Sequence, residues 1–325
     1  MRLVTYLDSH KKNRLALHVG ALNEGTLIDL NEALQAKGVH CPPDMNTLIS
    51  QFNELGPVLA TILHDQKEGK LAASAILAEK SVTLLSPIPR PLSMRDGYAF
   101  RQHVEAARRN RGVPMAPEFD LFPIFYYTNH LAVTGPGEIP VRPAARDKLD
   151  FELEVAIVIG KEGRDIPAAK ADEYIFGFMI MNDWSARSLQ MEEMKMNLGP
   201  AKGKDFATTL GPYLVTRDEL AKYAQSSANG ERHDLTMRCI VNGKQVSLGN
   251  VKDMSWTFAQ IIERISYGVT LHPGEVIGSG TVGTGCFLEL NGSKITDNQW
   301  LQDRDEVILE IDGLGKLTNT IKAVD

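Results

Sequence analysis

Cysteine is scarce in this chain of 325 residues, and its three copies, Cys41, Cys239 and Cys286, are widely spaced. Their number is odd and no Cys-x-x-Cys pair occurs, so the spacing argues against a disulfide framework and against a zinc site. We expect the three thiols to be reduced and mostly buried.

Long apolar runs are missing as well. None reaches the roughly 18 residues that a membrane span requires, and residues 1–8 lack the apolar core of a secretory signal peptide. The net charge is −6, and the arginine cluster near residue 110 is too short to form a basic stripe. We therefore expect a cytoplasmic protein with no membrane and no nucleic-acid partner.

Repeats and low-complexity tracts are absent, but prolines divide the chain in two. Pro87, Pro89 and Pro91 mark an extended connector. Before it we expect a small α/β N-terminal domain, residues 1–85, with strands near 3–6, 16–19 and 26–29 and helices near 31–36 and 45–62. After it we expect a strand-rich α+β domain, residues 86–325, with strands near 155–159, 213–215, 236–241 and 307–311 and helices near 98–111, 186–197 and 255–267. Asn242-Gly243 predicts a type I′ hairpin turn within this domain.

Two glutamates interrupt the apolar segment of residues 150–159. Strand alternation puts the apolar side chains on one face and Glu152 and Glu154 on the other, roughly 7 Å apart. Two buried like charges are costly unless a cation lies between them, and hard oxygen donors select Mg²⁺, Ca²⁺ or Mn²⁺. The simpler alternative is a pair of acids on the wet face of an amphipathic strand.

Two aspartates lie at the boundaries of predicted segments. Asp183 ends an apolar run that predicts a buried strand, where open sites tend to form; a helix N-cap is the alternative, and Ser185 suits that role equally. Asp96 opens a segment that carries Tyr98 and His103. A lone histidine is usually structural, but imidazole ordinarily titrates near neutral pH, so an acid-rich neighbourhood favours a general base. Together the four acids predict one divalent-cation site.

From about residue 90 to its end the chain resembles the fumarylacetoacetate hydrolase family. The matching segments are 96–103 (DGYAFRQH), 152–154 (ELE), 182–190 (NDWSARSLQ), 203–209 (GKDFATT), 278–281 (GSGT) and 286–290 (CFLEL). The resemblance implies metal ligands Asp96, Glu152, Glu154 and Asp183, catalytic residues His103, Glu289, Lys204 and Arg187, and substrate contacts Tyr98, Gln190, Thr281 and Thr208.

The same resemblance implies a mixed β-roll catalytic domain, a homodimer and one divalent cation. The implied reaction is hydrolysis of a C–C bond in a 1,3-diketo acid, with fumarylacetoacetate of tyrosine degradation as the first candidate. Water is then the nucleophile, and His103, oriented by Glu289, is the base. Alternatives are an acylpyruvate or fumarylpyruvate hydrolase, a keto-acid decarboxylase or hydratase, and a non-enzymatic keto-acid or metal sensor.

Three features qualify these expectations. Met194 stands where the animal fumarylacetoacetases have a substrate-contacting tyrosine, and Arg108, Arg109 and Arg111 do not align clearly with their substrate arginine. Residues 278–283 formally fit the dinucleotide fingerprint. We discount that match because residues 286–290 read as a strand, where a nucleotide site needs a helix N-terminus.

Overall fold

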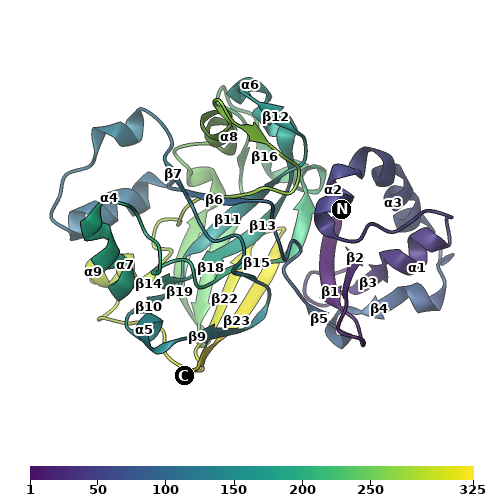
Figure 1. Ribbon diagram of the computed structural model, residues 1–325, viewed down its shortest axis with the longest axis horizontal. Helices are drawn as coiled ribbons and strands as arrows, with labels where there is room; N and C mark the ends of the chain where they lie inside the picture. Colours follow the sequence, from purple (N-terminus) through teal and green to yellow (C-terminus); the bar gives the residue numbers. More distant parts are fainter.

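A small N-terminal lobe stands beside a larger strand-rich body in the computed structural model, which describes residues 1–325 (Figure 1). The lobe confirms its predicted strands as β1 (Arg2–Leu7), β2 (Asn13–Val19) and β3 (Thr26–Asp29), and adds β4 (Ile76–Ala78) and β5 (Thr83–Leu84). The first predicted helix is α1 (Leu30–Gln35), and the second is divided into α2 (Met45–Ser50) and α3 (Phe52–Lys67). Side chains of Asp29 and Asp44 cap α1 and α2.

One sheet of 12 strands runs through both parts of the molecule. Its order is β4-β3-β2-β1-β15-β13-β11-β21-β6-β7, with β5 beside β1 and β8 beside β15. The lobe joins the body where β1 pairs antiparallel with β15 (Thr208–Thr216). The other strands of the body in this sheet are β6 (Met94–Gly97), β7 (Phe125–Tyr127), β8 (Val133–Thr134), β11 (Leu153–Ile159), β13 (Ile175–Asp183) and β21 (Val276–Gly278). The boundary near residue 85 stays a prediction, because the sheet is continuous across it.

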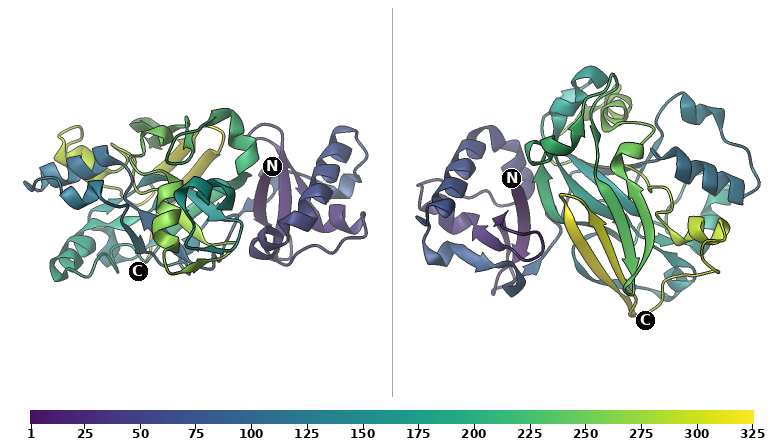
Figure 2. Two further views of the ribbon diagram at one scale, coloured as in Figure 1. Left: turned by 90° about the horizontal axis from the view of Figure 1, so that it is seen from above. Right: turned by 180° about the vertical axis from the view of Figure 1, so that it is seen from behind.

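A second sheet packs against the first in the body. It has five strands in the order β19-β18-β22-β23-β9, namely β19 (Lys244–Asn250), β18 (Thr236–Val241), β22 (Glu306–Ile311), β23 (Gly315–Ala323) and β9 (Gly137–Val141). The predicted hairpin joins β18 to β19, and Asn242 and Gly243 both have positive φ, 49° and 77°. The views in Figure 2 show the two sheets as layers of the body, with the lobe at one side.

Both faces of the large sheet are buried at its central strands. On β11, Val155, Ile157 and Ile159 face the core of 49 residues that lies between the two sheets, and Ala156 and Val158 face a second core of 22 residues that extends under the helices of the lobe. The predicted alternation in this strand is therefore correct. The face that carries the glutamates, however, is covered by protein and does not face water.

Short helices and ribbons complete the body. The predicted helices appear as α4 (Arg101–Asn110), α7 (Arg187–Glu193) with a 3₁₀ turn at Met194–Met196, and α8 (Phe258–Ser266). The remaining α-helices and strands of the body are α5 (Pro143–Arg146), α6 (Ala168–Ala171), α9 (Phe287–Gly292), β10 (Leu149–Asp150), β14 (Ser185–Ala186), β12 (Gly163–Arg164), β20 (Thr270–Leu271), β16 (Ala224–Gln225) and β17 (Arg232–His233). The strand-rich α+β class is as predicted.

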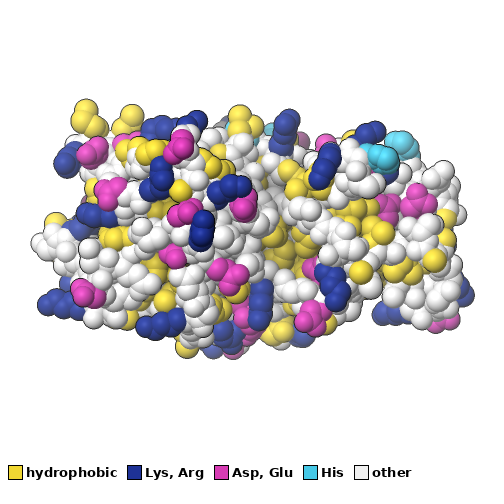
Figure 3. All heavy atoms as spheres, turned by 90° about the horizontal axis from the view of Figure 1, so that it is seen from below, with side chains coloured by type: hydrophobic (Ala, Val, Ile, Leu, Met, Phe, Trp, Pro, Cys, Tyr) yellow, Lys and Arg dark blue, Asp and Glu magenta, His cyan; other side chains and the backbone are white.

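The surface and the helix lengths agree with the composition. None of the helices combines the length and the hydropathy that a membrane crossing demands. On the face drawn in Figure 3, acidic and basic side chains are interspersed, and no patch of a single sign dominates. Of the three cysteines, Cys239 and Cys286 are buried, Cys41 is half-buried, and all three are free thiols, as expected.

Candidate active site

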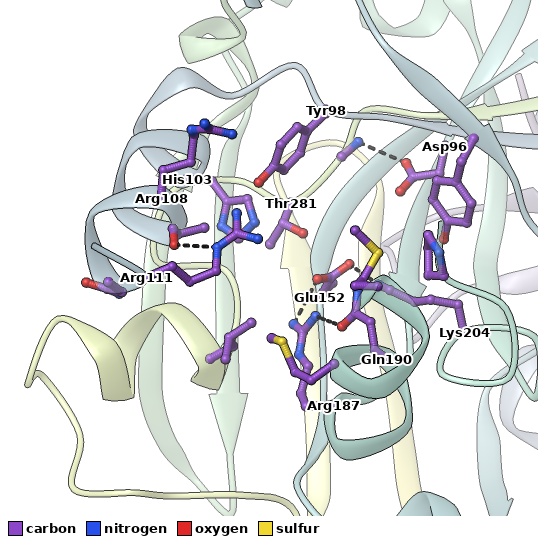
Figure 4. A pocket seen from close by; sticks show the side chains of 18 of the residues that line it. Asp96, Tyr98, His103, Arg108, Arg111, Glu152, Arg187, Gln190, Lys204 and Thr281 are labelled. Carbon is purple, nitrogen blue, oxygen red and sulfur yellow. Dashed lines mark hydrogen bonds and ion pairs between the residues drawn. The ribbon is translucent and has the colours of Figure 1, made fainter. Parts of the chain in front are cut away.

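A cavity of about 590 Å³ lies where α4, α7 and α9 meet the ends of the central strands (Figure 4). Its size is typical of sites for small molecules. Most of the predicted site residues line it: Asp96, Tyr98, His103, Glu152, Arg187, Gln190, Lys204 and Thr281. Four others, Glu154, Asp183, Glu289 and Thr208, do not appear in its wall.

Strands β13, β11 and β6 bring three of the predicted acids together, with β21 between β11 and β6 in the sheet. Asp96 lies near the end of β6, Glu154 near the start of β11 and Asp183 at the end of β13. Oxygen atoms of these three carboxylates all lie within 4.8 Å of one another, and the residues are at most 3% exposed. The wet-face alternative for Glu154 is therefore wrong. So is the N-cap alternative for Asp183, because α7 begins at Arg187 and has no side-chain cap.

A close backbone approach shapes this cluster. Asp96 Oδ1 accepts a hydrogen bond of 3.0 Å from the backbone N–H of Gly280, and a Cβ at Gly278 would lie 2.4 Å from the same oxygen. Only glycine at position 278 leaves room for the carboxylate. The glycine-rich segment therefore allows the backbone to approach the acid cluster closely.

The donors around the cluster do not satisfy all its oxygens. Asp183 Oδ2 accepts from Tyr126 Oη at 2.6 Å and from Lys204 Nζ at 2.8 Å, and Glu154 Oε1 accepts from Thr281 Oγ1 at 3.3 Å. Asp183 Oδ1 and Glu154 Oε2 are buried and have no hydrogen-bond partner. Buried polar atoms are nearly always paired, so two orphan oxygens in one acidic cluster indicate a missing positive group.

The pKa values point the same way. Burial, with the charge of Asp183, raises the pKa of Asp96 to about 7, and burial with the charge of Asp96 raises that of Glu154 well above its ordinary value. Burial also raises the pKa of Asp183, although Lys204 opposes the shift. Three carboxylates that resist ionisation side by side, with free lone pairs, fit a divalent cation bound by oxygen.

The fourth predicted ligand, Glu152, has different partners. Its Oε1 accepts from Arg187 Nη2 at 2.8 Å and its Oε2 from Lys204 Nζ at 2.5 Å. Burial alone would raise the pKa of Glu152, but Lys204 and Arg187 lower it to about 2. Glu152 thus stays ionised and, through Lys204, lies next to Asp183 at the rim of the cluster. Its role as a metal ligand remains a prediction.

Metal binding should depend on pH in a defined direction. The folded pKa values of Asp96 and Glu154 exceed the unfolded ones, so the stability from their protonation is complete below the unfolded pKa and is lost as pH rises through the folded value. A cation binds the deprotonated groups and offsets that loss. We expect the rise in melting temperature on adding Mn²⁺, relative to chelator, to be larger at about pH 8 than at about pH 6. Equal shifts at both pH values would contradict the assignment.

The predicted histidine and glutamate form a buried pair. His103, on the first turn of α4, and Glu289, on the first turn of α9, share a hydrogen bond of 2.7 Å between Nδ1 and Oε2. The backbone N–H of Thr284 donates to the other glutamate oxygen at 2.9 Å. The ring of Tyr98 lies edge to face with that of His103, with 5.7 Å between centroids. The carboxylate thus fixes the orientation of an imidazole that reaches the cavity.

The segment that carries Glu289 is helical, so the predicted strand at residues 286–290 is wrong. The N–H groups of Phe287 and Leu288 donate to the two oxygens of Asp150, at 2.7 and 3.0 Å. A carboxylate from a distant part of the chain therefore caps α9 and starts the helix. Because no strand follows residues 278–283, the absence of a helix no longer argues against a dinucleotide site there. Asp150 argues against it instead, since its carboxylate already occupies the N-terminus of α9.

Arg187 and Gln190 lie three positions apart on α7, and both line the cavity. Arg187 Nε donates to Asp150 Oδ2 at 2.8 Å, and Arg187 Nη1 donates to Gln190 Oε1 at 2.9 Å. The guanidinium group is 3% exposed and is held by Asp150, Glu152 and Gln190 at once. Such a fixed group can orient a neighbouring carboxylate and polar ligand, but it cannot swing freely toward substrate.

The two predicted threonines differ in position. Thr281 lines the cavity and bonds Glu154. Thr208 is buried on β15, pairs in register with Asp183 and accepts, through its backbone carbonyl, a long hydrogen bond of 3.5 Å from Thr134. It lies behind the acid cluster, not in the cavity wall, so a direct substrate contact by Thr208 has no support in this geometry.

Two residues of this site escaped the sequence reasoning. Tyr126 lines the cavity and bonds Asp183, and Asp150 ties Arg187 to α9. Pairing between β6 and β7 sets Tyr126 opposite Asp96, a contact with no local sequence signal. Asp150 begins the 150–159 segment, but its neighbours in the sequence do not indicate that it bonds Arg187 and the first turn of α9.

This chain resembles known proteins in sequence and in fold. A sequence model described as Fumarylacetoacetate (FAA) hydrolase C-terminal matches residues 93–322. The human mitochondrial oxaloacetate tautomerase FAHD2A is 31% identical over 324 residues, which cover 99% of this chain and 91% of that protein. A fumarylacetoacetase of Oryza sativa subsp. japonica is 31% identical over 275 residues, 67% of this chain and 64% of that one.

Among solved structures, maleylpyruvate hydrolase from Sphingobium sp. SYK-6, in complex with manganese(II) and pyruvate, superposes with a TM-score of 0.71 at 20% identity and full coverage of both chains. This likeness shows the fold. With the family match over residues 93–322 and the whole-length relatives, it leads to one conclusion: the chain belongs to the fumarylacetoacetate hydrolase family of enzymes.

Proposed function

We propose that this protein is a metal-dependent hydrolase that cleaves a C–C bond of a 1,3-diketo acid. The observation that carries the proposal is that His103, paired with Glu289, lines the same cavity as Asp96 of the acid cluster. One group is suited to take a proton from water and the other to hold a cation. The rice fumarylacetoacetase and the Sphingobium maleylpyruvate hydrolase, by their names, act on diketo acids of this kind.

Asp96, Glu154 and Asp183, with Glu152 beside them, would hold Mg²⁺, Mn²⁺ or Ca²⁺. Such a cation would supply Lewis-acid stabilisation of the negative charge that develops on the departing fragment. The Sphingobium hydrolase, whose structure contains manganese(II), supports a divalent ion here without identifying it.

The residues of the chain then supply proton transfer and positioning. With Nδ1–H of His103 donated to Glu289, Nε2 is left as the acceptor for a water proton. The water oxygen attacks the acyl carbonyl carbon, the C–C bond breaks, and its electron pair passes to the carbon of the leaving fragment, which is protonated. Lys204 and Arg187, held by Glu152, place fixed positive charge near the developing enolate.

Two arginines suit the far end of a dicarboxylic substrate. Arg108 and Arg111 line the cavity on the side of α4, and each uses only its Nε in a hydrogen bond to a backbone carbonyl, those of Pro114 and Ala107. Neither forms an ion pair with the chain, so their remaining N–H groups are available to a carboxylate. Met194, which also lines the cavity, adds an apolar wall in place of the tyrosine that the resemblance led us to expect.

Substituting these arginines should weaken substrate binding more than chemistry. We expect Arg108→Gln and Arg111→Gln each to raise KM by roughly tenfold with a smaller change in kcat, because the lost contact is made equally in ground and transition states. Arg109→Gln is the matched control, since this exposed neighbour does not line the cavity. Steady-state kinetics on a dicarboxylic and a monocarboxylic diketo acid would check this; an unchanged KM in both variants would exclude the subsite.

A second candidate is keto–enol tautomerisation of oxaloacetate. The likeness to the human tautomerase extends over 99% of this chain, further than that to the rice hydrolase, and this favours it. Tautomerisation moves a proton between carbon and oxygen and needs no attacking water. The same His103 and the same metal ligands would serve it.

The deciding experiment is turnover of a panel with Mn²⁺ or Mg²⁺ and with chelator: fumarylacetoacetate, fumarylpyruvate, acetylpyruvate and oxaloacetate. Chelator-sensitive release of fumarate and acetoacetate supports the hydrolase and a place in tyrosine degradation. Cleavage of a pyruvate derivative alone supports an acylpyruvate hydrolase. Loss of the oxaloacetate enol signal without any cleavage product selects the tautomerase, and inactivity on all four selects the sensor. A homodimer and a cytoplasmic location accompany the proposal as expectations.

A further inference from the structure

A second group of metal-binding side chains lies beside the first. A ring nitrogen of His103, the thiol of Cys286 and a carboxylate oxygen of Glu289 all lie within 4.8 Å of one another, and all three residues are buried, with Cys286 fully so. This group differs from the acid cluster in kind, since it offers nitrogen and sulfur where the other offers only oxygen.

The fold creates this group from two helices. Cys286 immediately precedes α9 and Glu289 is its third residue, so the helical turn brings the thiol and the carboxylate to the same end. Packing of α4 against α9 then adds His103. The spacing of cysteines in the sequence argues against a zinc site, but that reasoning covers only sites built from several cysteines.

We propose that the His103–Cys286–Glu289 group is an inhibitory site for a soft divalent cation, with Zn²⁺ as the fitting ion. Zinc binds thiolate at about 2.3 Å, imidazole nitrogen at about 2.0–2.1 Å and carboxylate oxygen at about 2.0–2.2 Å. Tetrahedral bonds of these lengths separate the donor atoms by roughly 3.4–3.6 Å. His103 Nδ1 and Glu289 Oε2, which now lie 2.7 Å apart, would therefore move slightly apart, and no donor pair lies beyond 4.8 Å at present.

The two groups would therefore bind different classes of ion: the acid cluster a hard ion, and the His103–Cys286–Glu289 group a softer one. Carboxylates select Mg²⁺, Mn²⁺ or Ca²⁺, whereas thiolate and imidazole favour zinc. Binding converts the Cys286 thiol to a thiolate, and the released proton passes to solvent. Zinc held by His103 Nδ1 and Glu289 would replace their mutual hydrogen bond and leave the imidazole proton on Nε2, which could then no longer accept a proton from water.

The test uses full-length protein saturated with Mn²⁺, and its first measurement does not depend on activity. Co²⁺ replaces zinc as a spectroscopic probe, because a cobalt–thiolate bond gives a charge-transfer band in the near ultraviolet that oxygen ligands do not give. We expect the band in the wild type and in the control Cys239→Ser, whose thiol is buried on β18 away from any such group, and its loss in Cys286→Ser and Cys286→Ala. Absence of the band in the wild type overturns the site.

The second measurement is zinc affinity by chelator competition, with inhibition of turnover where a substrate has been found. Zinc should bind Cys286→Ser at least about tenfold more weakly than the wild type or Cys239→Ser, since one soft ligand is removed. Cys286→Ser should keep its turnover without zinc, because a hydroxyl is tolerated before a helix. Equal zinc affinity in Cys286→Ser and wild type would place zinc elsewhere and overturn the proposal. Failure of the proposed hydrolase leaves the cobalt and affinity measurements intact.

Discussion

Replacing His103 with alanine is expected to lower kcat for hydrolysis by roughly 10²–10⁴-fold while leaving the cation bound. The imidazole reaches the cavity and is oriented by Glu289 through a 2.7 Å hydrogen bond, so its removal takes away the group that accepts the water proton. The acid cluster loses no ligand from this change. Steady-state turnover and the metal-induced rise in melting temperature, measured on the same preparation, check both halves of the expectation.

The comparison variant is Glu289→Gln, which keeps the shape of the pair and removes its charge. We expect a smaller fall in kcat than for His103→Ala, because the amide still bonds Nδ1 but no longer stabilises the protonated ring. If His103→Ala retained near wild-type turnover with metal bound, water activation by this residue would be excluded. Decarboxylation, which requires the metal's electron sink but no attacking water, would then be favoured.

Replacing Glu154 with glutamine is expected to have opposite effects on activity and on stability. Glu154 Oε2 has no partner, and no cation of the chain bonds this carboxylate. The variant should lose metal affinity and turnover by more than about 100-fold, because a ligand is removed. The metal-free variant should nevertheless be more stable than the metal-free wild type by roughly 1–3 kcal/mol, because the cost of a buried unsatisfied acid disappears.

The pH dependence of this gain follows from the raised pKa of Glu154. Wild-type stability from that group is present at low pH and is lost as pH rises, whereas glutamine carries no proton to lose. The stability difference should therefore grow from about pH 5 to about pH 8. Denaturant unfolding with chelator measures it. Glu275→Gln is unsuitable as a control because Glu275 forms a buried ion pair with Arg95, whereas Glu138→Gln is suitable because the ion pair of Glu138 with Lys322 is exposed and contributes little to stability. A metal-free variant less stable than the wild type would show that the cluster needs no added cation.

Local patterns in the sequence predicted much of this molecule. Alternation in residues 150–159, the turn at Asn242-Gly243 and the apolar run ending at Asp183 all correspond to observed elements. Each of these signals depends on a residue and its near neighbours, where side-chain period and backbone preference are enough. The order of the acids along the chain, together with the resemblance, indicated which strands would carry the site.

Such local patterns do not predict contacts between residues that are distant in the sequence. The helix at Phe287–Gly292 looks like a strand in isolation, and it is started by Asp150, which lies 137 positions earlier. Likewise, Tyr126 reaches Asp183 across 57 positions, and the ion pairs of Glu152 come from two other segments. These partners are chosen by strand pairing and helix packing, which one sequence does not reveal.

The pairing of β1 with β15 has a consequence for any attempt to produce the catalytic part alone. Removal of residues 1–85 would leave Leu214 and Val215 of β15 without the neighbours that Leu3 and Arg2 now provide. The strand would become an uncovered edge with the apolar sequence Leu-Gly-Pro-Tyr-Leu-Val at residues 210–215, and such an edge recruits other chains. By covering this edge, the lobe protects the protein from aggregation. A truncated protein should therefore precipitate even though its active-site residues are all present.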